Sequence, residues 1–184
     1  MSEHRLRPWR VLSSDYRIET PYLRLRADQV ELPSGHVVDD YFVRESRGFC
    51  VVFALTADER VVLVRQYKHG IRQVVLELPA GGIDPGETPQ ACVRRELAEE
   101  TGYAAASFEH VRTFITDPTN SDSYFHLFLA RGAALSGAQE LDLTEEIDVL
   151  LAPLGEVRAM ALDGRIASGS QVAAVLVALA ALDS

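Results

Sequence analysis

The alternation of apolar and polar residues in the first third of the chain predicts β-strands. Apolar and basic residues alternate over 22–26, as expected of a strand with one face turned to solvent. The turn residues 33–35 separate a second strand, over 29–32, from a third over 36–43. Together these strands predict a small antiparallel β-sheet near the N-terminus.

Two apolar runs in the middle of the chain predict the central strands. Phe49–Thr56 is almost continuously apolar, and a turn over 57–59 leads to Val61–Gln66, which we expect to be its hairpin partner. These two segments are the best candidates for core strands. A shorter strand is expected over 74–78, before the glycine-rich loop 79–87.

The clearest helix prediction covers Pro89–Thr101. Thr88 precedes it as an N-cap, proline suits the first helical position, and Gly102 is the expected stop. Three further strands and two final helices are expected at 109–115, 123–130, 147–152, 154–162 and 170–182, with a polar loop at 116–122. Strands interrupted by one central helix, with helices at the end, predict an α/β (α+β) sandwich rather than a regular βαβ series.

Composition narrows the possible functions. The 184 residues carry a net charge of −9, which argues against a nucleic-acid-binding surface, because such binding depends on lysines and arginines. An anionic substrate would therefore be met locally, through a metal. Cys50 and Cys92 match neither a disulfide framework nor a zinc spacing, so we interpret them as buried side chains in a reducing compartment. The longest apolar run is too short to span a bilayer, and we expect a soluble cytoplasmic protein with no membrane contact.

Three glutamates on the predicted helix indicate a metal site. Glu96, Glu99 and Glu100 fall within an arc of about 100°, while Arg94 and Arg95 lie elsewhere on the helix and cannot pair with all three. Like charges at this spacing destabilise an isolated helix, and a divalent cation is the obvious compensation. Hard oxygen ligands favour magnesium or manganese over zinc. A glutamate-rich helix can instead be a solvated face, but the preceding glycines allow close wrapping around a ligand.

The segment from Gly81 to Tyr103 resembles the Nudix box, whose pattern is G-x5-E-x7-R-E-U-x-E-E-x-G-U with U a bulky aliphatic residue. Every fixed letter matches at its spacing, and only Tyr103 departs, at a packing position. The resemblance implies a Nudix α/β/α sandwich with a mixed sheet. It also implies a metal-dependent enzyme that cleaves a diphosphate linkage, in which Arg95 would orient a carboxylate and Glu87 would do similar supporting work.

The same resemblance implies the metal ligands. Glu96 and Glu100 would be the main carboxylate ligands of Mg²⁺, with Mn²⁺ as a possible substitute. Glu99 would be a further ligand or the group that orients water, and the Ala80 carbonyl a backbone ligand. The metal would neutralise the diphosphate and lower the pKa of a bound water.

Residues beside the box resemble the branch of ADP-ribose pyrophosphatases and nucleoside diphosphate sugar hydrolases. The similarity covers LVRQYK at 63–68 and LELPAGG at 76–82, and Pro118 lies about where that branch carries a proline beside the ribose. By this analogy we expect residues 1–46 to form a dimerisation meander and residues 47–184 the Nudix catalytic domain, in a homodimer.

Three charged residues in these segments are candidates for substrate binding. Arg65 and Lys68 could contact the phosphates or the terminal ribose, with solvated charges at a strand end as the alternative. Glu77 lies in an otherwise apolar strand, where a carboxylate is seldom buried unless it is paired or ligating. It is expected near the metal or beside an arginine.

One departure from the family concerns the catalytic base. Related enzymes often carry a glutamate after an aspartate in the loop that follows Pro118, whereas here Asp122 is followed by Ser123. A serine hydroxyl cannot accept a proton from water at neutral pH without help. The alternatives are nearby carboxylates and one histidine: Asp122, Glu99, Glu145, Glu146 and, as a remote alternative, His126.

The leading hypothesis is metal-dependent hydrolysis of ADP-ribose or a related nucleoside diphosphate sugar to a nucleoside monophosphate and a sugar phosphate. A Nudix hydrolase of another diphosphate, such as a dinucleotide or a coenzyme, is the enzymatic alternative. A non-catalytic Nudix-fold sensor that regulates a partner is the other. The intact acidic set argues against the sensor, because a pure binder need not keep three like-charged neighbours.

Overall fold

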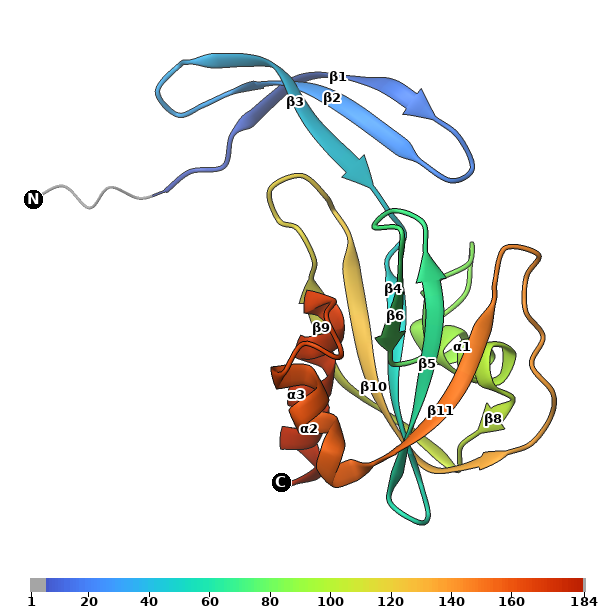
Figure 1. The fold of residues 1–184 in the computed structure, drawn as a ribbon. Coiled ribbons are helices and arrows are strands. Elements are labelled where there is room, and N and C mark those ends of the chain that lie inside the picture. Colours follow the sequence, from blue (N-terminus) through green and yellow to red (C-terminus); the bar gives the residue numbers. More distant parts are fainter. Residues whose placement is uncertain (1–5, 184) are drawn as a thin grey trace, which may run out of the picture. The chain divides into compact units, whose positions relative to one another are not determined.

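The computed structural model describes residues 6–183, which divide into two compact units (Figure 1). The first unit comprises the chain up to Ser46 together with Ile115–Tyr124, and the second comprises Arg47–Phe114 and the chain from Phe125 onward. The extreme ends of the two expected domains, residues 1–5 and 184, lie outside the described residues. No helix within residues 6–183 is long and apolar enough to cross a membrane.

The first unit contains a three-stranded antiparallel sheet in the order β1 (Arg10–Glu19), β2 (Arg24–Glu31) and β3 (Val37–Glu45). The expected small sheet is confirmed, with two corrections. The strands expected over 22–26 and 29–32 are one strand, β2. In addition, β1 was not predicted, because its apolar and polar residues do not alternate regularly in the sequence.

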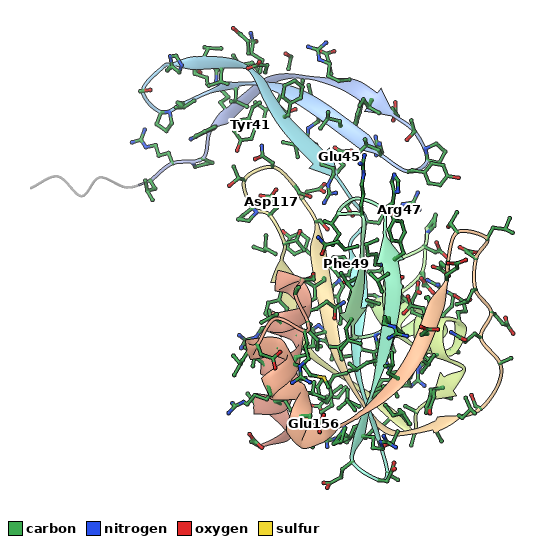
Figure 2. All side chains as sticks on the ribbon, viewed as in Figure 1. Tyr41, Glu45, Arg47, Phe49, Asp117 and Glu156 are labelled. Carbon is green, nitrogen blue, oxygen red and sulfur yellow. The ribbon has the colours of Figure 1, made fainter. Side chains whose placement is uncertain are left out.

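The segment Ile115–Tyr124 is bound to the edge of β3 in the first unit. The Arg44 N–H donates to the Asn120 carbonyl (2.8 Å), and the Tyr41 hydroxyl donates to the Thr119 carbonyl (2.6 Å). The Asp117 carboxylate accepts the N–H groups of Thr119 and Asn120, which closes a tight turn (Tyr41 and Asp117 are labelled in Figure 2). The polar loop therefore belongs with the N-terminal sheet.

The second unit is built on an eight-stranded mixed sheet in the order β11-β5-β4-β10-β8, with β6 on β5, β7 on β4 and β9 on β10. β4 and β10 run parallel, whereas β4–β5 and β5–β11 are antiparallel. The strands are β4 (Phe49–Thr56), β5 (Arg60–Lys68), β6 (Gln73–Glu77), β7 (Ala80–Gly82), β8 (Tyr103–Ala104), β9 (Ser107–Ile115), β10 (Tyr124–Leu135) and β11 (Ile147–Pro153).

Helices cover both faces of this sheet. Figure 1 shows α1 (Pro89–Thr101) on one face, and α2 (Leu154–Leu162) and α3 (Gly169–Leu182) on the other. Alternate residues of β4 enter two separate cores: Val51 and Phe53 pack with α2 and α3, whereas Cys50 and Val52 pack with α1. The α/β/α sandwich is confirmed, and the two cores explain why β4 is apolar at nearly every position.

The helix predictions agree closely with the structure. The Thr88 hydroxyl accepts the Ala91 N–H (3.2 Å), and α1 ends at Gly102, whose φ of 73° is left-handed and favours glycine. Glu156 in the first turn of α2 complements the positive end of the helix dipole (Figure 2). β7 and β8 were not predicted, because strands of two or three residues carry no readable periodicity, and part of the expected glycine loop is therefore strand.

Candidate functional site

The acidic flank of α1 lies against β7. The Ala80 N–H donates to Glu100 Oε2 (2.9 Å). A Cβ atom placed on Gly81 would lie 2.0 Å from Glu96 Cδ, so only glycine leaves room for that carboxylate. The pairing of β7 with β4 and the packing of α1 on the same sheet bring these groups together.

Burial raises the pKa of two of the three helix glutamates. Glu100 is only 3% exposed, and loss of hydration raises its pKa to about 8, against the opposing effect of the Ala80 hydrogen bond. The charge of Glu96 raises it further. Burial likewise raises the pKa of Glu96, whereas Glu99 keeps 38% of its side chain exposed.

Arg95 binds three carboxylates of the box, those of Glu87, Glu96 and Glu99. Its Nε and one Nη donate to the two Glu87 oxygens (2.9 Å each), and its other Nη donates to Glu96 Oε1 (2.7 Å) and Glu99 Oε2 (3.0 Å). The bidentate contact lowers the pKa of Glu87 to about 2 and, reciprocally, raises the pKa of Arg95. Arg95 thus reaches two of the three helix glutamates, and Glu100 is left without an arginine partner.

The donor chemistry of this site fits a hard divalent cation. Glu96 and Glu100 are desolvated carboxyl groups with raised pKa values, and a bound cation would stabilise the charged form of both. Within residues 6–183, no three acidic, histidine or cysteine side chains converge on one point that could hold a metal. A bound cation would therefore need side-chain movement to gather its ligands, because Arg95 holds Glu96 and Glu99 through one nitrogen.

Lys68 and Glu77 lie beside the acidic flank. The Lys68 Nζ is 3.7 Å from Glu77 Oε2, and the buried Gln66 amide also donates to that oxygen (3.4 Å). The charge of Lys68 lowers the pKa of Glu100. Glu77 is thus buried beside a lysine rather than an arginine, which was one of its two expected surroundings. Arg65 forms an exposed ion pair with Asp148 on β11 (2.7 Å).

The candidates for the catalytic base lie in different surroundings. The charge of Glu145 raises the pKa of both Glu96 and Glu100, which places Glu145 near the acidic flank. Glu145 Oε2 also accepts the Asp142 N–H (3.1 Å), which closes a turn before β11. The neighbouring Glu146 is exposed.

Pro118 and Asp122 belong to the first unit. Asp122 Oδ1 accepts the Ser46 N–H (2.9 Å) in that unit, and Ser123 is buried, at 3% exposure. His126 shares a hydrogen bond with a threonine hydroxyl on β9 (2.9 Å), and burial lowers its pKa. His126 is therefore a packed strand histidine, as expected.

One residue that contacts the acidic helix had no signal in the sequence. The Gln139 amide donates to the Glu100 carbonyl (2.6 Å) and to the Ile147 carbonyl (3.1 Å), so it ties the last turn of α1 to the start of β11. The Glu140 N–H similarly donates to the Glu99 carbonyl (2.9 Å). Both residues lie in an irregular segment, where neither periodicity nor a motif marks a role.

Comparisons with known proteins identify related sequences. The model of the NUDIX domain matches residues 44–173, and that of the nucleoside diphosphate sugar hydrolase N-terminal domain matches residues 9–43. The chain is 34% identical over 154 residues to the methanol dehydrogenase activator of Bacillus methanolicus, covering 83% of each chain. It is 32% identical over 179 residues to the ADP-ribose pyrophosphatase of Mycobacterium tuberculosis, covering 96% of this chain and 84% of that one.

A solved structure shows the same fold. The crystal structure of an ADP compounds hydrolase superposes with a TM-score of 0.84, covering 97% of this chain and 96% of that one, at 19% sequence identity.

Proposed function

The chain belongs to the Nudix family, and we propose that it hydrolyses ADP-ribose or a related nucleoside diphosphate sugar to a nucleoside monophosphate and a sugar phosphate. The observation that carries the proposal is the buried pair Glu96 and Glu100 held against Ala80 and Gly81 of β7. The matched N-terminal domain of nucleoside diphosphate sugar hydrolases and the ADP-ribose pyrophosphatase relative support the substrate class.

The proposed metal is Mg²⁺, with Mn²⁺ as a substitute, and it would neutralise the diphosphate and activate a water. Glu96 and Glu100 would hold it, and Glu99 and the Ala80 carbonyl would complete the ligand set. Glu100 is positioned for this by the Ala80 N–H, which fixes one of its oxygens (2.9 Å) and leaves the other available.

Arg95 and Glu87 are proposed to position the ligands. The bidentate pair between them fixes the guanidinium plane, so that the remaining Nη donates to Glu96 and Glu99. The same Arg95 also donates to the Gly82 carbonyl (3.0 Å), which ties the helix to β7.

We propose that the base comes from the segment before β11. Glu145, whose charge acts on Glu96 and Glu100, is the better supported residue there, beside the exposed Glu146. Asp122 and Glu99 are the alternatives that mutagenesis must compare. The base would take the proton of the attacking water.

Lys68, Arg65, Glu77 and Pro118 are proposed to contact the substrate. Glu77 restrains the Lys68 ammonium beside the acidic flank, where a phosphate oxygen would meet it. Arg65 would have to leave its exposed pair with Asp148, a change that costs little because exposed pairs contribute at most about 1 kcal/mol.

The free thiols of Cys50 and Cys92 suit the proposed cytoplasmic location.

The first unit is proposed to form a homodimer. β1 is exposed along its whole length, and Val11 and Ile18 are 57% and 41% exposed. Apolar surface of this kind marks an association site. Val11→Asp and Ile18→Asp should yield a monomer in analytical ultracentrifugation, and a wild-type monomer would refute the dimer.

The proposed activity is tested by product analysis over a panel of ADP-ribose, GDP-mannose, UDP-glucose and dinucleotides with Mg²⁺. Release of a nucleoside monophosphate and a sugar phosphate from ADP-ribose or a sugar nucleotide is the expected result. Turnover of dinucleotides alone would identify the alternative hydrolase. Metal binding without turnover of any panel member would refute the proposed enzymatic activity.

A regulatory role is the second candidate, because one relative is named as the activator of a dehydrogenase. Metal binding together with tight binding of an intact panel member, and no turnover, would favour it. The complete set of carboxylates in the box favours the enzyme.

A further inference from the structure

Between β6 and β7 the chain changes its neighbour in the sheet. β6 ends at Glu77 on β5, whereas β7 begins at Ala80 on β4. The pairing of β4 with β5 is confined to Leu55 and Val61, at the far end of both strands. Leu78 therefore lies where neither strand supplies a regular ladder partner, although it is fully buried.

A glutamine from α3 fills this gap. Gln171 Oε1 accepts the Leu78 N–H (3.0 Å), and Gln171 Nε2 donates to the Leu78 carbonyl (3.4 Å). Gln171 is only 3% exposed, and it lies in the first turn of a helix that is otherwise strongly apolar. Its side-chain amide thus takes the place of a strand, because buried backbone groups must be paired.

The contact between Gln171 and the Leu78 backbone lies immediately before the candidate metal site in the chain. Two residues after Leu78, the Ala80 N–H donates to Glu100, and the next residue, Gly81, lies against Glu96. Proline at the intervening position restricts the backbone, so that little slack separates the Gln171 contact from β7.

We propose that Gln171 is a positioning residue for the metal site. From the opposite face of the sheet, it holds β7 at the position where Ala80 and Gly81 meet Glu100 and Glu96. The proposal rests on the proposed function for its kinetic consequence, but the placement of β7 also predicts a change in metal binding that is measurable without a substrate.

A matched control separates positioning from plain stabilisation. Val175 lies one turn beyond Gln171 on the same helix and is fully buried in the core that α3 shares with the sheet. Truncating it leaves a cavity and destabilises the fold, but it leaves in place the hydrogen bonds between Gln171 and the Leu78 backbone. Val175→Ala therefore lowers the melting temperature without releasing β7.

The experiment compares Gln171→Met, Gln171→Asn and Val175→Ala. Methionine keeps the length of the side chain without the amide, and asparagine keeps the amide one methylene short of Leu78. Mn²⁺ binding is titrated by electron paramagnetic resonance, and kcat, KM and the half-saturating Mg²⁺ concentration are measured with ADP-ribose.

Both Gln171 variants should need about tenfold more Mn²⁺ or Mg²⁺ for half-saturation and show a lower kcat, with KM for ADP-ribose little changed. Val175→Ala should keep wild-type values despite a comparable fall in melting temperature. If Gln171→Met does not fold, Gln171→Asn carries the comparison.

Two outcomes would overturn the proposal. One is wild-type metal half-saturation in a folded Gln171 variant, and the other is an equal loss of metal binding in Val175→Ala. Failure of the proposed function looks different: the wild type would bind Mn²⁺ but turn over no panel member, and the Mn²⁺ titrations would still decide the role of Gln171.

Discussion

Gly81→Ala tests whether the position of the Glu96 carboxylate controls the reaction. An added Cβ would lie 2.0 Å from Glu96 Cδ, about 1.5 Å short of ordinary van der Waals contact. Because the carboxyl is the end of a flexible side chain, it can retreat while the fold stays intact. The carboxylate would then lie more than 1 Å from its present position.

A misplacement of about 1 Å in a reacting constellation can lower a rate about hundredfold. We therefore expect Gly81→Ala to reduce kcat about hundredfold and to weaken Mn²⁺ binding, with the free energy of unfolding changed by only about 1 kcal/mol. The measurements are steady-state kinetics with ADP-ribose and Mg²⁺, a Mn²⁺ titration and thermal unfolding.

The adjacent Gly82→Ala is a matched control. A Cβ on Gly82 meets no atom within 4 Å, so this variant should keep wild-type kinetics. Wild-type kcat and Mn²⁺ affinity in Gly81→Ala would refute the assigned role of Glu96. An equal loss in both variants would show that β7 tolerates no side chain and would contradict the role given to Glu96.

Three further predictions concern the remaining charges. Because burial raises the pKa of Glu100 from 4.5 to about 8, the folded chain binds this proton more tightly than the unfolded chain, and metal-free stability should fall as the pH rises from about 4.5 through 8. At about 1.4 kcal/mol per pKa unit, this fall in stability is at most about 5 kcal/mol. Glu100→Gln should abolish this fall, as measured by chemical denaturation, and should also abolish turnover. An active variant would disprove the ligand assignment. Arg95→Lys should raise the half-saturating Mg²⁺ at least about tenfold in a metal titration, because a lysine lacks the planar fork that bonds both Glu87 oxygens while another nitrogen reaches Glu96; an unchanged titration would count against its positioning role. Glu145→Gln, Glu146→Gln and Asp122→Asn should differ in pH-rate profiles, with the base variant at least about tenfold slower; if none is slower, Glu99 becomes the base to test.

Local sequence was enough to predict the acidic helix. Its N-cap Thr88, its stop at Gly102 and the spacing of its glutamates are all short-range properties, and the structure confirms the boundaries of α1 to the residue. The same spacing indicated that no arginine could pair with every glutamate, and Arg95 indeed reaches Glu96 and Glu99 but not Glu100.

Contacts between distant segments could not be predicted in this way. The pairing of Ala80 with Glu100 depends on β7, a strand of three residues with no periodicity of its own. Lys68 reaches Glu77 along the β5–β6 pair, although the register places Gln73 opposite Lys68. Gln139 reaches the Glu100 carbonyl from an irregular segment. In each case the contact depends on the folded arrangement, which brings together residues that no local sequence pattern links.

The sequence by itself determined the family and the α/β/α class and predicted the acidic ligands, because these follow from fixed spacings on one helix and its preceding loop. Only the tertiary structure decided which carboxylates are buried and therefore carry raised pKa values. It also decided that Gln171, ninety-three residues after Leu78, completes the backbone beside the site. Burial and backbone pairing depend on how the two faces of the sheet are covered, and that information exists only once the chain has folded.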